Sequence, residues 1–245
     1  MHTQDEARKV SVSVQAYARM AGICYLLTII FGALGEVYIP SLFIVTGDAA
    51  TTAQNIAAAP GIYRLGFACY LIEGICDVGL AWMFYVLLRP VHKEIALLSA
   101  FFGLVSMAIY AVMELFYFSA LFVARQPEYL NVFTRPQRDA LLLLLLKFFG
   151  AGLFMVFYGI AAMLRGYLIF RSGYLPRFLG ILLMAAGAGF ILKNVTLVLA
   201  PAYSHNAFLA PMFFAAVALA GWLLVRGVDV QRWDARVADQ VAGAD

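Results

Sequence analysis

Six runs of apolar residues, each with few charges, dominate this chain of 245 residues. A helix needs about 20 apolar residues to cross the hydrocarbon of a bilayer, and every run is close to or above this length. The chain is 64% hydrophobic and 13% charged, whereas soluble domains average roughly 45–50% apolar and about 25% charged residues. The sequence therefore predicts an all-α polytopic membrane protein, a bundle of six transmembrane helices, and excludes a water-soluble fold. The runs lie near residues 18–39, 65–88, 95–123, 140–164, 178–199 and 207–225.

Polar segments flank these runs and define the expected organisation of the chain. We expect a cytoplasmic N-terminal segment over residues 1–17, a six-helix transmembrane domain over 18–225 and a cytoplasmic tail over 226–245. The first run follows basic residues, as the apolar part of a signal peptide does, but it exceeds the roughly 7–15 residues of such a segment. We therefore interpret it as a retained span. The tail is too short for another domain, and we expect a surface or frayed helix there.

The distribution of lysine and arginine predicts the orientation, because cytoplasmic flanks of spans carry more of them. Two lysines, Lys147 and Lys193, lie within runs. Four arginines fall on one side, namely Arg64, Arg125, Arg135 and Arg138. The remaining basic residues fall on the other side: Arg8, Lys9, Arg19, Arg89, Lys93, Arg165, Arg171, Arg177, Arg226, Arg232 and Arg236. This excess predicts that both termini are cytoplasmic.

The longest connection on the external side runs over residues 40–63. An alanine-rich stretch, 49–59, follows Asp48 and ends before Pro60 and Gly61. Aspartate is a favoured N-cap residue, and proline with glycine ends helices. We expect a short interfacial helix here, capped by Asp48, with Arg64 at the entrance of the next span.

Six charged residues interrupt the apolar runs. A charge at the centre of a span costs about 2.5–3.5 kcal/mol on insertion scales for Asp, Lys or Arg, so these side chains should face the bundle interior, pair with one another or change protonation state. Counting 1.5 Å per residue from the external helix ends predicts a shared layer for Glu73, Glu114, Lys147 and Lys193, with Asp77 a turn deeper. The six are Glu36, Glu73, Asp77, Glu114, Lys147 and Lys193.

Glycines and tyrosines recur at helical spacing from these charges, which permits close helix approach and supplies hydroxyl partners. Three interpretations stay open: structural ion pairs, a site for a ligand, ion or proton, and a catalytic site. Four acids against two lysines favour a protonated carboxyl or a bound cation. The candidate ligand-binding residues are Glu73, Asp77, Glu114, Lys147, Lys193, Tyr70, Tyr110 and Arg64.

Other chemistry-bearing patterns are absent from the sequence. Cys24, Cys69 and Cys76 all fall in apolar runs without the spacing of a metal site, and His205 has no second histidine near it. No nucleotide-binding loop, zinc-protease motif or serine triad order occurs. We therefore expect no metal and no cofactor, and the scattered basic residues predict no nucleic-acid partner.

The order of short motifs resembles the bacterial domain-of-unknown-function family numbered 4386. The motifs are Gly47-Asp48-Ala49, Thr52-Ala53-Gln54-Asn55-Ile56, Arg64-Leu65-Gly66, Asp77 with Leu80-Ala81, Tyr85-Val86-Leu87-Leu88, Pro90-Val91, the string from Gly166 to Arg177, and Gly180. The resemblance covers about residues 18–225 and is most specific over 166–177. It implies a multi-span protein of unassigned activity in the bacterial cytoplasmic membrane. This chain departs from the family pattern at Gly103, where arginine is frequent, and near Ala161, where histidine is, which puts a shared polar site in doubt.

The sequence favours a protein that binds or translocates a small solute, ion or lipid through a polar intramembrane pocket open to the external side. One alternative is an intramembrane enzyme that uses a carboxylate such as Asp77 or Glu73 as general acid or base on a lipid or isoprenoid. The other is a structural or regulatory membrane subunit. Membrane lipids are the expected partners, and the sequence leaves open whether the chain forms a homo-oligomer.

Overall fold

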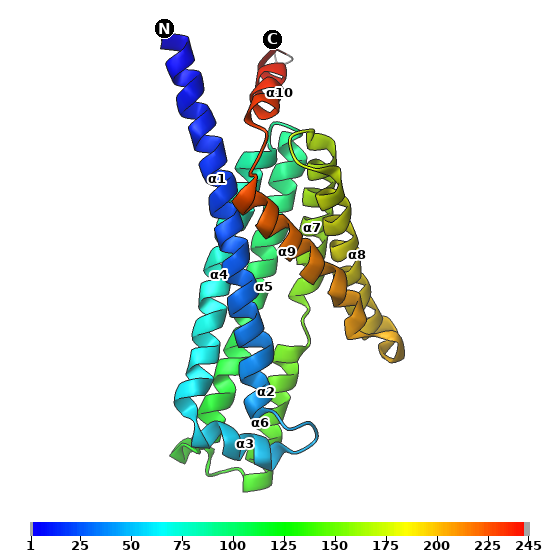
Figure 1. Ribbon diagram of the computed structural model, residues 1–245. Coiled ribbons are helices and arrows are strands. Elements are labelled where there is room, and N and C mark those ends of the chain that lie inside the picture. Colours follow the sequence, from blue (N-terminus) through cyan, green and yellow to red (C-terminus); the bar gives the residue numbers. More distant parts are fainter. Residues whose placement is uncertain (1, 243–245) are drawn as a thin grey trace. The chain divides into compact units, whose positions relative to one another are not determined.

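The computed structural model describes residues 2–242, with side chains described for residues 14–240 (Figure 1). Within this range the secondary structure is helical, without β-strands. The α-helices are α1 (His2–Gly32), α2 (Ile39–Phe43), α3 (Ala49–Ala58), α4 (Pro60–Leu88), α5 (Lys93–Ala124), α6 (Arg135–Gly150), α7 (Phe154–Ser172), α8 (Arg177–Leu199), α9 (Ala210–Val225) and α10 (Val230–Ala242). A π-helical segment, η1 (Ala33–Tyr38), joins α1 to α2, and short 3-10 turns η2 (Glu128–Leu130), η3 (Pro201–Tyr203) and η4 (Asn206–Leu209) lie in the loops.

Six helical segments of residues 2–242 are long and apolar enough to cross a membrane, which confirms the predicted all-α, six-span architecture. Each contains one predicted apolar run; three extend beyond it at both ends and the other three only at the N-terminal end. The protein is therefore a multi-pass integral membrane protein. The spans are Val14–Phe43, Pro60–Leu88, Lys93–Ala124, Arg135–Ser172, Arg177–Leu199 and Asn206–Val225.

The fourth span is interrupted, although its sequence predicted one continuous helix over 140–164. The α-helix α6 ends at Gly150, and α7 begins only at Phe154. Gly152 has a φ of 67°, the left-handed conformation that commonly ends a helix and that glycine adopts without steric cost. Hydropathy does not detect this break, because all residues around it are apolar or glycine.

The chain divides into two compact units. Unit 1 contains residues 1–26, 76–107 and 154–245, and unit 2 contains residues 27–75 and 108–153. Three helices, α1, α4 and α5, contribute residues to both units.

In unit 1, α7 and α8 are antiparallel neighbours joined by a short turn, and α8 also packs against α9 (Figure 1). Glycines form the contact between α7 and α8. A Cβ atom built on Gly166 would lie 2.7 Å from the carbonyl oxygen of Gly180, and one built on Gly180 would lie 2.5 Å from that of Gly166. Gly159 and Gly187 form a second pair of this kind, seven residues along each helix. The two backbones therefore touch at two levels, as small residues allow in membrane helices.

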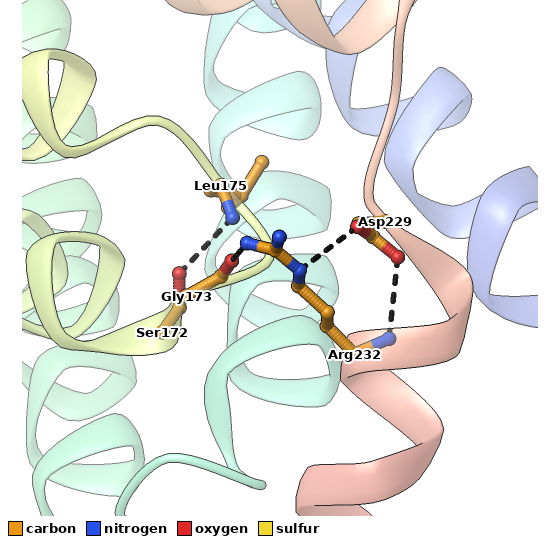
Figure 2. A network of polar contacts seen from close by, with 5 residues as sticks. All are labelled: Ser172, Gly173, Leu175, Asp229 and Arg232. Atoms are coloured by element: carbon orange, nitrogen blue, oxygen red, sulfur yellow. Dashed lines mark hydrogen bonds and ion pairs between the residues drawn. The ribbon is translucent and has the colours of Figure 1, made fainter.

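The C-terminal helix α10 also belongs to unit 1. Trp233 is buried, and its indole Nε1 donates to the carbonyl oxygen of Leu87 at the end of α4, 3.0 Å away. Arg232 pairs with Asp229 and donates to the carbonyl oxygen of Gly173, just after α7 (Figure 2). The end of α7 is itself fixed by Ser172, whose hydroxyl accepts from the backbone N–H of Leu175 (Figure 2). The tail thus forms a helix that binds the carbonyl ends of α4 and α7, in agreement with the expected surface helix.

In unit 2, the predicted short helix and its aspartate cap are confirmed. The Asp48 carboxylate accepts from the backbone N–H of Thr51 at 2.9 Å and from the Thr51 hydroxyl at 2.6 Å, and α3 follows directly. These bonds, that from the hydroxyl first, hold the pKa of Asp48 below its usual value. Asn55 on α3 donates to the carbonyl oxygen of Phe43, the last residue of α2. The cap and this bond together fix α3 beside the end of the first span.

Candidate functional site

The hydroxyl group of Tyr110, on α5 in unit 2, lies between two carboxyl groups. It is 3.1 Å from Oε1 of Glu36 and 2.9 Å from Oε2 of Glu73. A tyrosine has one hydroxyl proton, so it donates fully to one carboxylate at a time. The second contact becomes a hydrogen bond when that carboxyl group carries a proton and donates to the tyrosine oxygen. The geometry therefore suits a state in which one of the two carboxyl groups carries a proton, in addition to the hydroxyl proton of Tyr110.

Glu114 is the third carboxyl group of this arrangement, one helical turn after Tyr110 on α5. Its side chain is only 3% exposed, and Glu36 acts on it electrostatically. Its Oε1 atom is buried and has no hydrogen-bond partner. Buried oxygens in folded proteins are nearly always satisfied, and an exception calls for an explanation such as a functional role or a bound water molecule or ion. We call Glu36, Glu73, Tyr110 and Glu114 the carboxyl cluster.

The local backbone explains how the cluster is assembled. Glu36 lies in η1, and a π-helical turn is wider than an α-helical turn, so it changes the direction of the side chains it carries. Gly32, just before η1, gives Glu73 its space, because a Cβ atom at this position would lie 2.9 Å from Glu73 Oε1. Burial increases across the cluster: Glu36 is exposed, Glu73 half-buried and Glu114 buried. The cluster therefore leads from the surface of unit 2 into its core.

Aromatic side chains form a rigid wall beside the carboxyl cluster. Tyr63 and Tyr117 stack with ring centroids 4.2 Å apart, and each hydroxyl donates to the other residue's backbone carbonyl. Tyr70 packs edge-on against Tyr117 and Tyr110, and its hydroxyl donates to the carbonyl oxygen of Gly35. All four tyrosines are buried, so their hydroxyl groups are fixed by these bonds rather than by water.

Among the described side chains, no three His, Cys, Asp or Glu residues gather closely enough to hold a metal ion. Two of the three glutamates of the carboxyl cluster, Glu36 and Glu73, are joined instead through the hydroxyl of Tyr110.

Comparison with known proteins assigns the chain to a family. Residues 20–227 match the family described as "Domain of unknown function (DUF4386)". The chain belongs to the DUF4386 family. The match covers residues of both units and includes the carboxyl cluster. It confirms the resemblance that the short motifs indicated.

This DUF4386 protein is also similar to an uncharacterised protein of the archaeon Archaeoglobus fulgidus. The two are 30% identical over 170 residues, which are 69% of this chain and 86% of the relative. No solved structure matches the chain. The family assignment therefore supports the membrane architecture and names no substrate.

Four of the predicted ligand-binding residues of this DUF4386 protein lie together in unit 2. They are Glu73, Glu114, Tyr110 and Tyr70. Tyr110 was expected beside Glu114 because the two are four residues apart on one helix, and the structure agrees. That these residues bind a ligand stays a prediction.

The expectation that Lys147 faces the interior is wrong. Lys147 is exposed, in the last turn of α6, where helix carbonyl groups without intrahelical partners carry partial negative charge. Its long apolar stem lets the ammonium group reach away from the core. Arg64 is likewise exposed, near the start of α4.

Asp77 and Lys193 belong to unit 1 rather than to the unit that holds the carboxyl cluster. Lys193 is buried and Asp77 half-buried. The expectation that Lys193 pairs with another intramembrane charge stays a prediction, as does the shared layer of charges.

Two functional candidates were missed or misplaced by the sequence reasoning. The sequence predicted Glu36 as an intramembrane charge but not as a ligand-binding residue. Glu36 lies in the π-helical segment η1 and contacts the hydroxyl of Tyr110. Arg165 was counted as a cytoplasmic flanking residue. It is instead 3% exposed and lies two turns inside α7. Because Arg165 is close in the sequence to Arg171 and Arg177, the count of basic residues grouped it with these flanking arginines.

Proposed function

We propose that this DUF4386 protein binds and releases a proton at the carboxyl cluster, as the coupling ion of a membrane carrier for a small solute, ion or lipid. The observation that supports the proposal is the single hydroxyl of Tyr110 held within hydrogen-bond distance of two carboxyl groups, Glu36 and Glu73. Ionisable residues within membrane spans are costly, and where they occur they commonly serve ion pathways and proton relays.

The buried end of the cluster supports the same function. Glu114 presents an oxygen atom without a hydrogen-bond partner to the interior of unit 2. A proton on this carboxyl group removes its charge and supplies a donor, so proton transfer among the three carboxyl groups changes which contacts the cluster can make. Such a change is the kind of local event that alternates a carrier between two conformations.

The test is infrared difference spectroscopy of the purified protein between acidic and alkaline pH. The C=O stretch of protonated carboxyl groups should appear in the wild-type spectrum, and Glu73→Gln should remove part of it. Tyr110→Phe should shift the frequency of that band, because it removes the hydroxyl that contacts both carboxyl groups. Glu128→Gln is the matched control, since Glu128 is an exposed glutamate in the loop before α6 and its loss should leave the band of the cluster unchanged.

A functional measurement completes the test. Liposomes that contain the protein and an internal pH dye should show faster proton movement under an imposed membrane potential than empty liposomes. Glu114→Gln should slow this movement by about tenfold or more, because a glutamine side chain cannot take up or release a proton. Identical infrared bands and fluxes in the wild type, Tyr110→Phe and Glu73→Gln would contradict the proposal.

We also propose that the protein lies in a bacterial cytoplasmic membrane with both termini in the cytoplasm. Ten of the basic residues assigned to that side remain flanking once Arg165 is removed from the eleven. In a variant without Cys24, Cys69 and Cys76, a cysteine in place of Asp239 should resist an impermeant thiol reagent in intact cells, whereas one in place of His205 should react. External labelling at position 239 would reverse the assignment.

A further inference from the structure

Arg165 is a buried arginine within a membrane span of unit 1. Its side chain is 3% exposed, and the residue lies seven positions, or about 10 Å, before the end of α7 at Ser172. A guanidinium group keeps its positive charge under all conditions that proteins experience, so burial does not neutralise it. The charge therefore has to be balanced by groups around it.

Two protein groups contact the guanidinium of Arg165 directly, one through a hydrogen bond and one through an aromatic ring. Nη1 donates to the hydroxyl of Tyr25, 3.2 Å away, and the central carbon lies 4.6 Å from the ring centroid of Phe84. Nε is buried and has no hydrogen-bond partner. In an arginine side chain, Nε–H and one N–H of Nη2 point in the same direction, so the edge opposite the Tyr25 contact is left with an unused donor.

Small residues lie beside this edge. A Cβ atom built on Gly103 would be 3.9 Å from Nη2 of Arg165 and 3.5 Å from the Cβ atom of Ala81. At Gly103, Nη2 of Arg165 therefore faces a residue without a side chain. Tyr158, two turns before Arg165 on the same face of α7, interacts with it electrostatically and adds a hydroxyl group to the surroundings.

Asp77 is the acidic residue that acts on Arg165 in unit 1. It shares a face of α4 with Ala81 and Phe84 and interacts with the guanidinium electrostatically. Asp77 also has other interactions of its own. The hydroxyl of Tyr25 accepts the hydrogen bond from Nη1 of Arg165, whereas Nε of Arg165 is left without a partner.

We infer that the Nε and Nη2 edge of Arg165 binds an oxyanion, a phosphate or carboxylate group, between α4, α5 and α7 of unit 1. Two parallel N–H donors match the two oxygens of such a group and provide the bidentate geometry for which arginine is used in anion recognition. The same chemistry fits a lipid headgroup phosphate and a soluble anion. The site is separate from the carboxyl cluster and does not depend on the proposed proton binding.

The test measures the melting temperature of the purified protein in nonionic detergent. Inorganic phosphate is compared with chloride at equal ionic strength, and micelles with phosphatidylglycerol are compared with micelles with phosphatidylcholine. A rise with phosphate supports a soluble oxyanion, and a rise with phosphatidylglycerol alone supports a lipid headgroup. No rise in either comparison overturns the inference.

Variants locate the effect. Arg165→Lys keeps the charge but loses the paired donors, and the apparent affinity for the stabilising anion should fall about tenfold or more. Arg177→Lys is the matched control, because Arg177 also lies over an aromatic ring, that of Phe170, but is exposed; it should behave as the wild type does. An equal response of Arg165→Lys and the wild type overturns the inference, since the anion then acts elsewhere.

Asp77→Asn keeps the inference testable if Arg165→Lys fails to fold. Removing the negative charge that acts on Arg165 should strengthen oxyanion binding, because the ligand no longer competes with Asp77 for the guanidinium. If Asp77→Asn abolishes the response to both anions, Asp77 is the structural partner of Arg165 and no oxyanion site exists there.

Discussion

Gly187→Ala should destabilise this protein, although the same change at an unhindered helical glycine is neutral or favourable. The added Cβ atom would overlap the carbonyl oxygen of Gly159 and lie 2.8 Å from the Met163 side chain. Both helices would have to separate, and overpacking of this kind costs about 1–3 kcal/mol. Gly180→Ala meets the same obstacle at Gly166. The double variant should lose roughly 2–6 kcal/mol, since the two contacts are about 10 Å apart along the helix and should add.

Gly221→Ala is the matched control for this prediction. Gly221 lies on α9 in the same unit, and a Cβ atom built there meets no atom within 4 Å. Alanine is a better helix former than glycine by roughly 0.5–1 kcal/mol, so this variant should be as stable as the wild type or more so. The measurement is the fraction of monodisperse protein that remains in detergent after heating. If Gly187→Ala and Gly221→Ala have the same effect, α7 and α8 do not depend on glycine contact.

The sequence predicted the spans of this fold but not the contacts between them. Apolar length is a property of one segment, so each run of about 20 residues could be recognised alone. The contact between α7 and α8 depends on which glycine of one helix meets which glycine of the other. The sequence spacing of seven residues within each helix does not identify the partner glycine on the other helix. The break before Phe154 depends on the backbone conformation of Gly152, which apolar neighbours hide.

The candidate site was predictable to a similar degree. Glu73 and Glu114 interrupt apolar helices, and Tyr110 is one turn from Glu114, so hydropathy and helical spacing were enough to select them. The predictions for Lys147 and Arg165 failed because a long side chain near the end of an apolar run can point toward the core or toward the surface. Lys147 is exposed and Arg165 is buried. The π-helical turn that brings Glu36 to Tyr110 has no signature in the apolar pattern.

Trp233→Ala should release α10 from unit 1 while the spans stay folded. The indole ring is 5% exposed, and its N–H binds the carbonyl oxygen of Leu87, which also accepts a hydrogen bond from the hydroxyl of Tyr174. Truncating a buried tryptophan to alanine costs about 3–5 kcal/mol. A helix of 13 residues is marginal in water without packing, so α10 should unfold once it is released.

Trypsin cleavage after Arg232 and Arg236 measures this release, because both arginines lie within α10 and become accessible when the helix unfolds. A loss of 3–5 kcal/mol corresponds to an increase of about 10²-fold or more in the cleavage rate, provided that opening is fast relative to cleavage. Trp233→Phe keeps an aromatic ring but loses the N–H donor, so it should cost about 1 kcal/mol for the hydrogen bond and raise the rate far less. Trp82→Ala is the control. Trp82 is a tryptophan on α4 that is 52% exposed, and the hydrogen bond to the carbonyl oxygen of Leu87 comes from Trp233 instead. If cleavage in Trp233→Ala is no faster than in Trp82→Ala, then α10 is held by the exposed contacts of Arg232, Arg236 and Gln240 with the helix ends, and the buried indole is not what attaches it.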